Sequence, residues 1–259
     1  MFLDWLRRRR RERILAEPFP EAWDELLPRH MGCWRELSDE ERGHLRQLVQ
    51  VFVAEKHWEG LGGLEMSDEI KVTVAAQACL LILYLHHDLY RQVESILVYP
   101  STMVAPQRPT SIFGVATSPP KGPMPILGQA FSRGPVILAW DAVRRGGENP
   151  RDGHNVVFHE FAHKIDMLDD VVDGTPPMAR SEIDRWVQVC TAEYERAQLG
   201  GDDLLDSYAG VNTGEFFAVA TEVFFDRPVE MAEQKPDLYE VLSGFYRQDP
   251  AARVTGTPR

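Results

Sequence analysis

Residues 155–168 read Asn-Val-Val-Phe-His-Glu-Phe-Ala-His-Lys-Ile-Asp-Met-Leu, and this stretch is the most informative part of the sequence about the fold. Large apolar side chains recur in it at helical spacing and cover most of its circumference, which predicts a buried helix over about residues 155–167. His159 and His163 are one helical turn apart, so they lie on one face of that helix. Burying them together with Glu160 is costly unless these polar groups have a partner.

The pattern His159-Glu160-x-x-His163 is typical of a metal site. Two imidazoles on one helical face can bind the same divalent ion, and the carboxylate after the first histidine lies beside a water molecule on that ion. The sequence therefore predicts one Zn²⁺ per chain, with Glu160 as the general base.

A catalytic zinc ion usually has three protein ligands, so a third is expected downstream. Asp169 follows the second histidine by six residues, the spacing of one class of zinc peptidase, but that class needs a glycine where this sequence has Asp166. Glu215 and Glu222 are two turns apart on a second apolar segment, where one carboxylate can bind the ion and the other can orient a histidine. The spacing alone leaves Asp169, Glu215 and Glu222 open.

Helices are predicted on both sides of a short β region. A capping box at Ser38–Glu41 starts one helix, and Ser67 starts an apolar helix that runs through Leu85. Helical spacing of apolar residues also predicts helices over residues 182–198, 215–225 and 236–247.

Short β-branched runs between these helices predict strands. Ile96–Tyr99 and Pro135–Trp140 have this character, and loops rich in proline and glycine surround the short run Ile112–Val115. Helices, then short strands, then helices again is an order that predicts an α+β fold, mainly helical with a small mixed sheet. We expect residues 1–90 to form a helical N-terminal region packed on a core of residues 91–259.

The composition narrows the class of protein. The chain has 259 residues with 40 acidic and 28 basic side chains, so its net charge of −12 argues against direct binding to nucleic acid. The most apolar segment, Val72–Leu85, is shorter than the roughly 20 residues that span a bilayer, so no membrane span is expected. Three cysteines without CxxC spacing suit a reducing compartment, and we expect a cytoplasmic protein. The basic run Arg7–Arg11 is either a solvated, frayed terminus, which we favour, or, with the apolar residues before it, a tag for a membrane surface or nucleic acid.

Several segments together resemble a known family. Residues 152–168, Ser207–Ala209, Glu215–Val219 and the tail Phe245–Pro250 look like the Mlc titration factor A (MtfA) family of zinc metallopeptidases, and Gly134–Asp141 does so less closely. The likeness covers most of the chain beyond residue 90, and it is the combination of motifs that makes it specific.

The resemblance implies a zincin-like catalytic core similar to that of the anthrax lethal factor protease. It also implies a cytoplasmic, gluzincin-type zinc peptidase with aminopeptidase-like activity on peptide substrates, and binding to a glucose-responsive transcriptional repressor of the Mlc type. In the MtfA family, as in the anthrax lethal factor protease, a tyrosine precedes the glutamate ligand by seven residues. The resemblance therefore selects Tyr208 and Glu215 here. Glu222 is then expected near the ligands or in the core.

The expected mechanism follows from these assignments. With zinc on His159, His163 and Glu215, Glu160 takes a proton from water and passes it to the leaving amine, while Tyr208 donates a hydrogen bond to the oxyanion. Acidic residues after the second histidine are further candidates to accept hydrogen bonds from the imidazoles.

Two alternatives remain at this point. Val136–Trp140 is either an edge strand that holds an extended peptide by backbone pairing or a plain core strand. The whole protein is either a peptidase or a non-catalytic protein that binds a regulator, in which the metal is structural.

Overall fold

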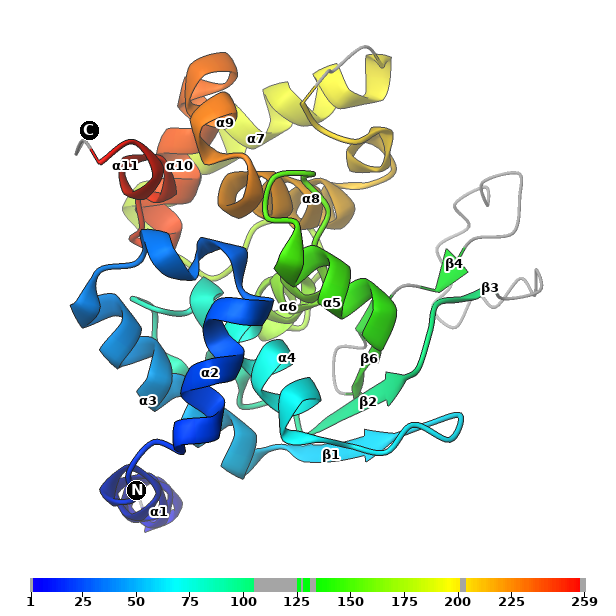
Figure 1. Ribbon diagram of the computed structural model, residues 1–259. Helices are drawn as coiled ribbons and strands as arrows, with labels where there is room; N and C mark the ends of the chain where they lie inside the picture. The colour runs from blue at the N-terminus through cyan, green and yellow to red at the C-terminus, as the bar shows by residue number, and fades with distance from the viewer. Residues whose placement is uncertain (1, 105–124, 127, 131–133, 201–203, 257–259) are drawn as a thin grey trace.

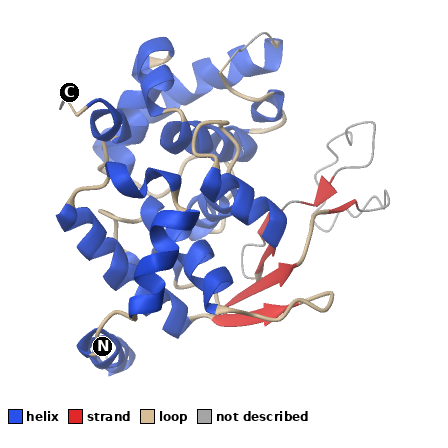
Figure 2. Ribbon diagram, in the orientation of Figure 1, coloured by secondary structure: helices blue, strands red, loops and turns tan. Residues whose placement is uncertain are grey.

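The helix with the two histidines, α6 (Val156–Asp166), lies at the centre of the molecule, between other helices and a small sheet (Figure 1). The fold was taken from a computed structural model, which describes residues 2–104, 125–126, 128–130, 134–200 and 204–256. Figure 2 shows that helices make up most of these residues and that the strands gather on one side. The expected mainly helical α+β fold is confirmed.

The main sheet has four short strands, β1 (His57–Gly60), β2 (Ser95–Tyr99), β6 (Val136–Ala139) and β5 (Gly128–Ala130), in that spatial order. The first three are parallel, and β5 runs antiparallel to β6, so the sheet is mixed, as predicted. A separate antiparallel pair joins β3 (Met103–Val104) to β4 (Pro125–Ile126).

The described sheet decides one open alternative and corrects one expectation. Of the two interpretations of Val136–Trp140, the plain core strand holds, because β6 lies between β2 and β5, and the strand's apolar side chains suit this interior position. Residues 1–90 are not wholly helical, because β1 lies among them and pairs with β2. Ile112–Val115 lies outside the described residues, and the division of the chain at residue 90 stays a prediction.

Four helices come from the N-terminal third of the chain: α1 (Phe2–Ala16), α2 (Glu21–His30), α3 (Asp39–Glu55) and α4 (Asp68–Leu81). The capping box of α3 is confirmed, since the Glu41 backbone N–H donates to the Ser38 hydroxyl and the Glu41 carboxylate accepts from the Ser38 backbone N–H. The apolar helix α4 is buried almost all round and ends four residues before the predicted Leu85.

Arg7–Arg10 are exposed, as expected of a solvated run, but the run lies in helix α1 and is not frayed. α1 packs against α3, and the guanidinium of Arg11 forms ion pairs with Glu55 and with Asp88 at 2.6 and 2.9 Å. Arg11 thereby connects α1 to two separate parts of the N-terminal third.

The remaining helices follow β6. They are α5 (Trp140–Glu148), α6, α7 (Arg180–Leu199), α8 (Thr213–Asp226), α9 (Pro228–Gln234), α10 (Pro236–Tyr246) and α11 (Pro250–Thr255). Short 3₁₀ turns lie between some elements and are η1 (Gly32–Glu36), η2 (His87–Tyr90), η3 (Met167–Asp169) and η4 (Ser207–Gly210). The helices predicted in this half of the sequence are all present, with ends that differ by a few residues.

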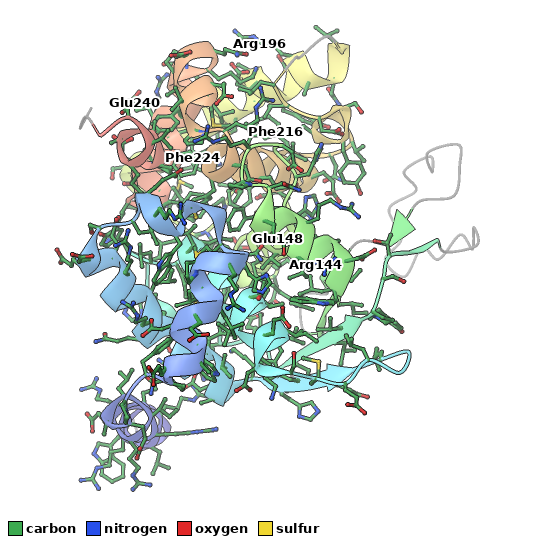
Figure 3. The ribbon with its side chains drawn as sticks, in the orientation of Figure 1. Arg144, Glu148, Arg196, Phe216, Phe224 and Glu240 are labelled. Carbon is green, nitrogen blue, oxygen red and sulfur yellow. The ribbon has the colours of Figure 1, made fainter. Side chains whose placement is uncertain are left out.

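Aromatic packing fixes α6 and α8 against the rest of the protein. Phe161 on α6 is fully buried against the ring of Tyr90, with centroids 4.8 Å apart. On α8, Phe216 and Phe224 (labelled in Figure 3) are buried against rings from α7 and α10. Because α6 and α8 also pack on each other, the polar residues of the two helices share one interface. Among the described residues, none of the helices has the length and apolarity needed to cross a membrane.

Candidate metal centre

The start of α6 is fixed by Asn155. Its side-chain oxygen accepts hydrogen bonds from the backbone N–H groups of Val157 and Phe158, both at 3.0 Å, as an N-cap does. The first histidine of the motif is on the first turn after this cap, so its position depends on where the helix begins. The second histidine follows one turn later on the same face.

Three side chains from α6 and α8 converge at one point. The Nε2 atoms of His159 and His163 are 3.2 Å apart, and Oε2 of Glu215 is 3.0 Å from the first and 3.2 Å from the second. Within the described part of the chain, this trio is the group of residues that could hold a metal ion. The third ligand that the family resemblance selected is therefore the carboxylate that the structure places beside the two histidines.

These donors fit a zinc ion in both spacing and chemistry. Ligands of a tetrahedral Zn²⁺ at about 2.0–2.1 Å are roughly 3.3 Å from one another, close to the separations of the trio. Burial opposes charge on His159 and on Glu215, yet their mutual contacts hold the pKa of His159 well above, and that of Glu215 well below, its usual range. Two imidazole nitrogens and a carboxylate oxygen that face one point form a donor set that suits a divalent cation.

Glu222 holds His159 from the opposite side of its ring. Its Oε1 is 2.7 Å from Nδ1 of His159, and its Oε2 accepts the backbone N–H of Asn155 at 2.6 Å. The carboxylate is buried, so both contacts are shielded from water. In the neutral imidazole, an acceptor at Nδ1 keeps the proton on that nitrogen and leaves the lone pair of Nε2 available to a metal ion.

Glu160 is buried beside the trio with one carboxylate oxygen unpaired. The residue is 5% exposed, and among the described residues its Oε2 has no hydrogen-bond partner. Burial raises the pKa of Glu160 to about 7, although the two histidines act in the opposite direction. A carboxyl group with such a pKa exchanges protons readily near neutral pH, as a general base must.

Tyr208 reaches the same centre from η4. Its ring centroid is 6.1 Å from that of His159, and its hydroxyl is hydrogen-bonded to Glu215. Burial and the neighbouring Glu215 carboxylate raise the pKa of Tyr208, so the phenol keeps its proton and remains a donor.

The other sequence candidates lie outside the trio. Asp169 is exposed on η3, where it accepts the backbone N–H of Val171 at 3.1 Å. Asp166 is fully buried, and its Oδ2 accepts the backbone N–H of Gly174 at 3.1 Å. Among the described residues, the Nδ1 atom of His163 has no hydrogen-bond partner, so neither acid holds it as Glu222 holds His159.

Two residues of the site were missed by sequence reasoning. Asn155 caps α6 and connects that cap to Glu222, and an asparagine directly before an apolar periodic segment is a signal that could have identified it. Lys164 is buried and donates to the carbonyl of Gly134 at 2.8 Å, which ties α6 to the segment before β6. A lysine within an apolar helical segment carries no sequence signal of its burial.

Comparison with known proteins shows the family to which the chain belongs. A family model described as glucose-regulated metallo-peptidase M90 matches residues 5–247, so the chain belongs to this family of metallopeptidases. The trio of His159, His163 and Glu215 agrees with the metal ion that such a family implies.

Individual relatives cover nearly the whole chain. An uncharacterised protein of Synechocystis sp. is 34% identical over 255 residues, which are 96% of this chain and 90% of that protein. Proteins named Mlc titration factor A from Edwardsiella ictaluri and Serratia proteamaculans are 32% and 31% identical over 92% and 84% of this chain, and over 89% and 84% of their own length. The family likeness inferred from the motifs is therefore confirmed.

Proposed function

We propose that the protein is a zinc-dependent peptidase whose metal is held by His159, His163 and Glu215. The observation that carries the proposal is the convergence of these three donors at 3.0–3.2 Å beside a buried, unpaired Glu160. When bound, zinc supplies the Lewis acidity that polarises a carbonyl group and makes water nucleophilic near neutral pH. Membership of a metallopeptidase family supports this chemistry.

Glu160 acts as the proton carrier of the reaction. Its unpaired oxygen accepts a proton from the attacking water and delivers it to the nitrogen of the leaving amine. Without a metal ion, burial raises the pKa of Glu160 to about 7, and a bound cation would favour the carboxylate form that accepts the proton.

Tyr208 acts as the donor to the oxyanion of the tetrahedral intermediate. Its hydroxyl already lies at the carboxylate of Glu215, and its protonated form is favoured by its surroundings. One such donor contributes about 10²–10³ in rate.

The finer class we propose is a gluzincin with a zincin-like core and aminopeptidase-like activity. The support is the glutamate as third donor and an antiparallel strand, β5, that packs near α6 at the edge of the described sheet. An extended peptide pairs most readily with such an edge. We therefore propose that β5, and not residues 136–140, pairs with an extended peptide substrate.

Replacing Glu160 with glutamine tests the proposal. The amide keeps the shape of the side chain but cannot take a proton, so we expect hydrolysis of short peptides and amino-acid anilides to fall about 10²–10⁴-fold. Zinc content by elemental analysis should stay near one ion per chain. Unchanged turnover with zinc bound contradicts the assigned role, and a zinc-free wild-type protein contradicts the metal site.

We also propose that the protein binds a transcriptional repressor of the Mlc type in the cytoplasm. The support is the name Mlc titration factor A carried by its relatives, and the three cysteines, Cys33, Cys79 and Cys190, which are free thiols. Purified repressor should bind the wild-type protein and the Glu160→Gln variant equally, which separates binding from hydrolysis. Absence of binding to either protein refutes this second function.

A further inference from the structure

Helix α1 concentrates positive charge on one element of an acidic protein. It carries six of the 28 basic side chains and two of the 40 acidic ones, in a chain whose net charge is −12. Five of its arginines, Arg7–Arg10 and Arg13, are exposed. Figure 1 shows α1 at the margin of the molecule, away from the central helix α6 that carries the two histidines. The basic surface of α1 is therefore separate from the candidate metal centre.

Contacts on one side of α1 fix its rotation about its own axis. Among the described side chains of this helix, Arg11 and Ile14 are partly buried, and the guanidinium of Arg11 forms the two ion pairs given above. The side-chain amide of Gln50, on α3, donates to the backbone carbonyls of Ile14 and Glu17, both at 2.9 Å. One side of α1 therefore packs on the protein, and the opposite side is directed outward.

The outward side of α1 combines aromatic, aliphatic and basic side chains. At 3.6 residues per turn, Trp5, Arg9 and Arg13 form one row, which lies opposite to the side that packs on α3, and Leu6 lies beside this row. The guanidinium of Arg9 is over the Trp5 ring, 4.2 Å from its centroid. Trp5 and Leu6 are 46% and 43% exposed. Helix geometry therefore places these four side chains, which we call the outward face, on one surface.

The arginines of α1 repel one another within the helix. Arg7 and Arg11 are four residues apart, as are Arg9 and Arg13, and like charges at this spacing destabilise a helix. Among the described residues, Arg11 alone of the arginines in α1 has an acidic side chain within 4 Å. An anionic surface against the outward face would neutralise the remaining charges and relieve the repulsion.

The apolar side chains of the outward face favour a membrane surface over nucleic acid. Nucleic acid would neutralise the arginines with its phosphates, but its backbone offers no apolar layer for Leu6. An anionic lipid bilayer offers phosphate headgroups to the arginines and an interfacial layer in which tryptophan and leucine side chains are stabilised. A helix at the margin can also contact a membrane while the acidic body of the protein stays farther away, which screening by salt makes less costly.

We propose that the outward face of α1 binds the surface of an anionic lipid bilayer, with its arginines at the headgroup phosphates and with Trp5 and Leu6 in the interfacial layer. Such a helix lies on the membrane and does not span it, so the binding is peripheral and reversible. The sequence favoured a solvated terminus for this run, whereas the fixed helix and its mixed outward face favour the membrane surface. The inference goes beyond the proposed peptidase function and does not depend on it.

Sedimentation of the full-length protein with lipid vesicles tests the inference. The vesicles consist of phosphatidylcholine alone or of phosphatidylcholine mixed with the anionic lipid phosphatidylglycerol. The charge variant carries Arg7→Gln, Arg8→Gln and Arg9→Gln, and a second variant carries Trp5→Ser.

The matched control loses three positive charges elsewhere on the surface. It carries Arg29→Gln, Arg144→Gln and Arg151→Gln, whose side chains are 67%, 55% and 76% exposed. Thermal unfolding of each variant verifies that it is folded.

We expect the wild type to bind anionic vesicles at least about tenfold more strongly than neutral ones, with weaker binding at higher salt. The charge variant should lose at least about tenfold of this binding, and the control should bind like the wild type. Trp5→Ser should lose about threefold or more, because its apolar area no longer enters the interfacial layer.

Other results overturn the inference. It is wrong if the wild type does not bind anionic vesicles, if it binds neutral vesicles equally well, or if the charge variant binds like the wild type. A duplex DNA oligonucleotide, titrated in the same buffer and followed by fluorescence anisotropy, tests the other class of polyanion. Binding to this DNA without binding to anionic vesicles would assign the outward face to nucleic acid and contradict the membrane proposal.

Discussion

Replacing Glu222 with glutamine tests how His159 is prepared to bind a metal. The substitution keeps the size of the side chain and removes its charge. In the wild type, Oε1 is 2.7 Å from Nδ1 of His159, and Oε2 accepts the backbone N–H of Asn155 at 2.6 Å. Glutamine offers one acceptor and one donor, so it cannot satisfy both of these N–H groups.

Both orientations of the glutamine amide weaken the metal site. If its oxygen faces His159, a charge-assisted hydrogen bond becomes a neutral one, which loses about 1–2 kcal/mol, and the amide donor faces the Asn155 N–H. If the NH₂ group faces His159 instead, Nδ1 must be the acceptor and Nε2 carries the proton, which blocks metal binding. We expect zinc affinity to fall roughly 10- to 100-fold, the usual range for such outer carboxylates.

Chelator competition at constant pH measures the zinc dissociation constants of the wild type and the variant. Glu240→Gln on α10 is the matched control, because Glu240 is exposed and its loss changes the net charge equally. Thermal unfolding of the metal-free proteins separates a loss of metal affinity from a loss of fold. An unchanged zinc affinity in a folded Glu222→Gln protein would refute the assigned role of Glu222.

Three further predictions concern other parts of the site. Tyr208→Phe should lower kcat about 10²–10³-fold while zinc content is unchanged, as steady-state kinetics and elemental analysis would show; equal loss of zinc would instead make Tyr208 a structural residue. Gly174→Ala should destabilise the fold by at least about 1–3 kcal/mol in urea unfolding, because of its positive φ and the close Thr213 carbonyl, and a neutral effect would contradict this packing. Burial raises the pKa of Asp166 to about 6 in the folded protein, compared with about 3.9 in the unfolded chain. Protonated Asp166 therefore contributes to the stability of the folded protein fully below pH 3.9, and this contribution is lost as the pH rises through 6. Metal-free Asp166→Asn should therefore gain stability relative to wild type between pH 4 and pH 7.5, by up to about 3 kcal/mol, and a constant difference across that range would show that Asp166 is not titrating as stated.

The sequence predicted the helices of the site well, because their signals are local. The capping residue Ser38 and the apolar periodicity around His159 and in α8 act within a few turns of chain, and each corresponds to a helix in the structure. The end of α4 was less predictable, since Ile82–Leu85 continues the apolar run although the helix stops at Leu81.

Contacts between segments far apart in the sequence could not be predicted from local sequence patterns. β1 is four residues long and forms by pairing with β2 nearly forty residues later. The antiparallel β5 makes β6 an interior strand, a question that the sequence had left open. Spacing alone left Asp169, Glu215 and Glu222 as alternatives for the third donor. The packing of α8 on α6 places Glu215 at Nε2 of His159 and Glu222 at Nδ1 of the same ring. The different positions of the two glutamates therefore depend on how the two helices pack, which local sequence patterns do not reveal.

The most direct test of the account is a crystal structure of the zinc-loaded protein with anomalous data collected on both sides of the zinc absorption edge. We predict one anomalous peak per chain, about 2.0–2.2 Å from Nε2 of His159, Nε2 of His163 and a carboxylate oxygen of Glu215, with Glu222 at Nδ1 of His159. A peak coordinated by Glu222 or Asp169 in place of Glu215, or no peak between α6 and α8, would contradict it.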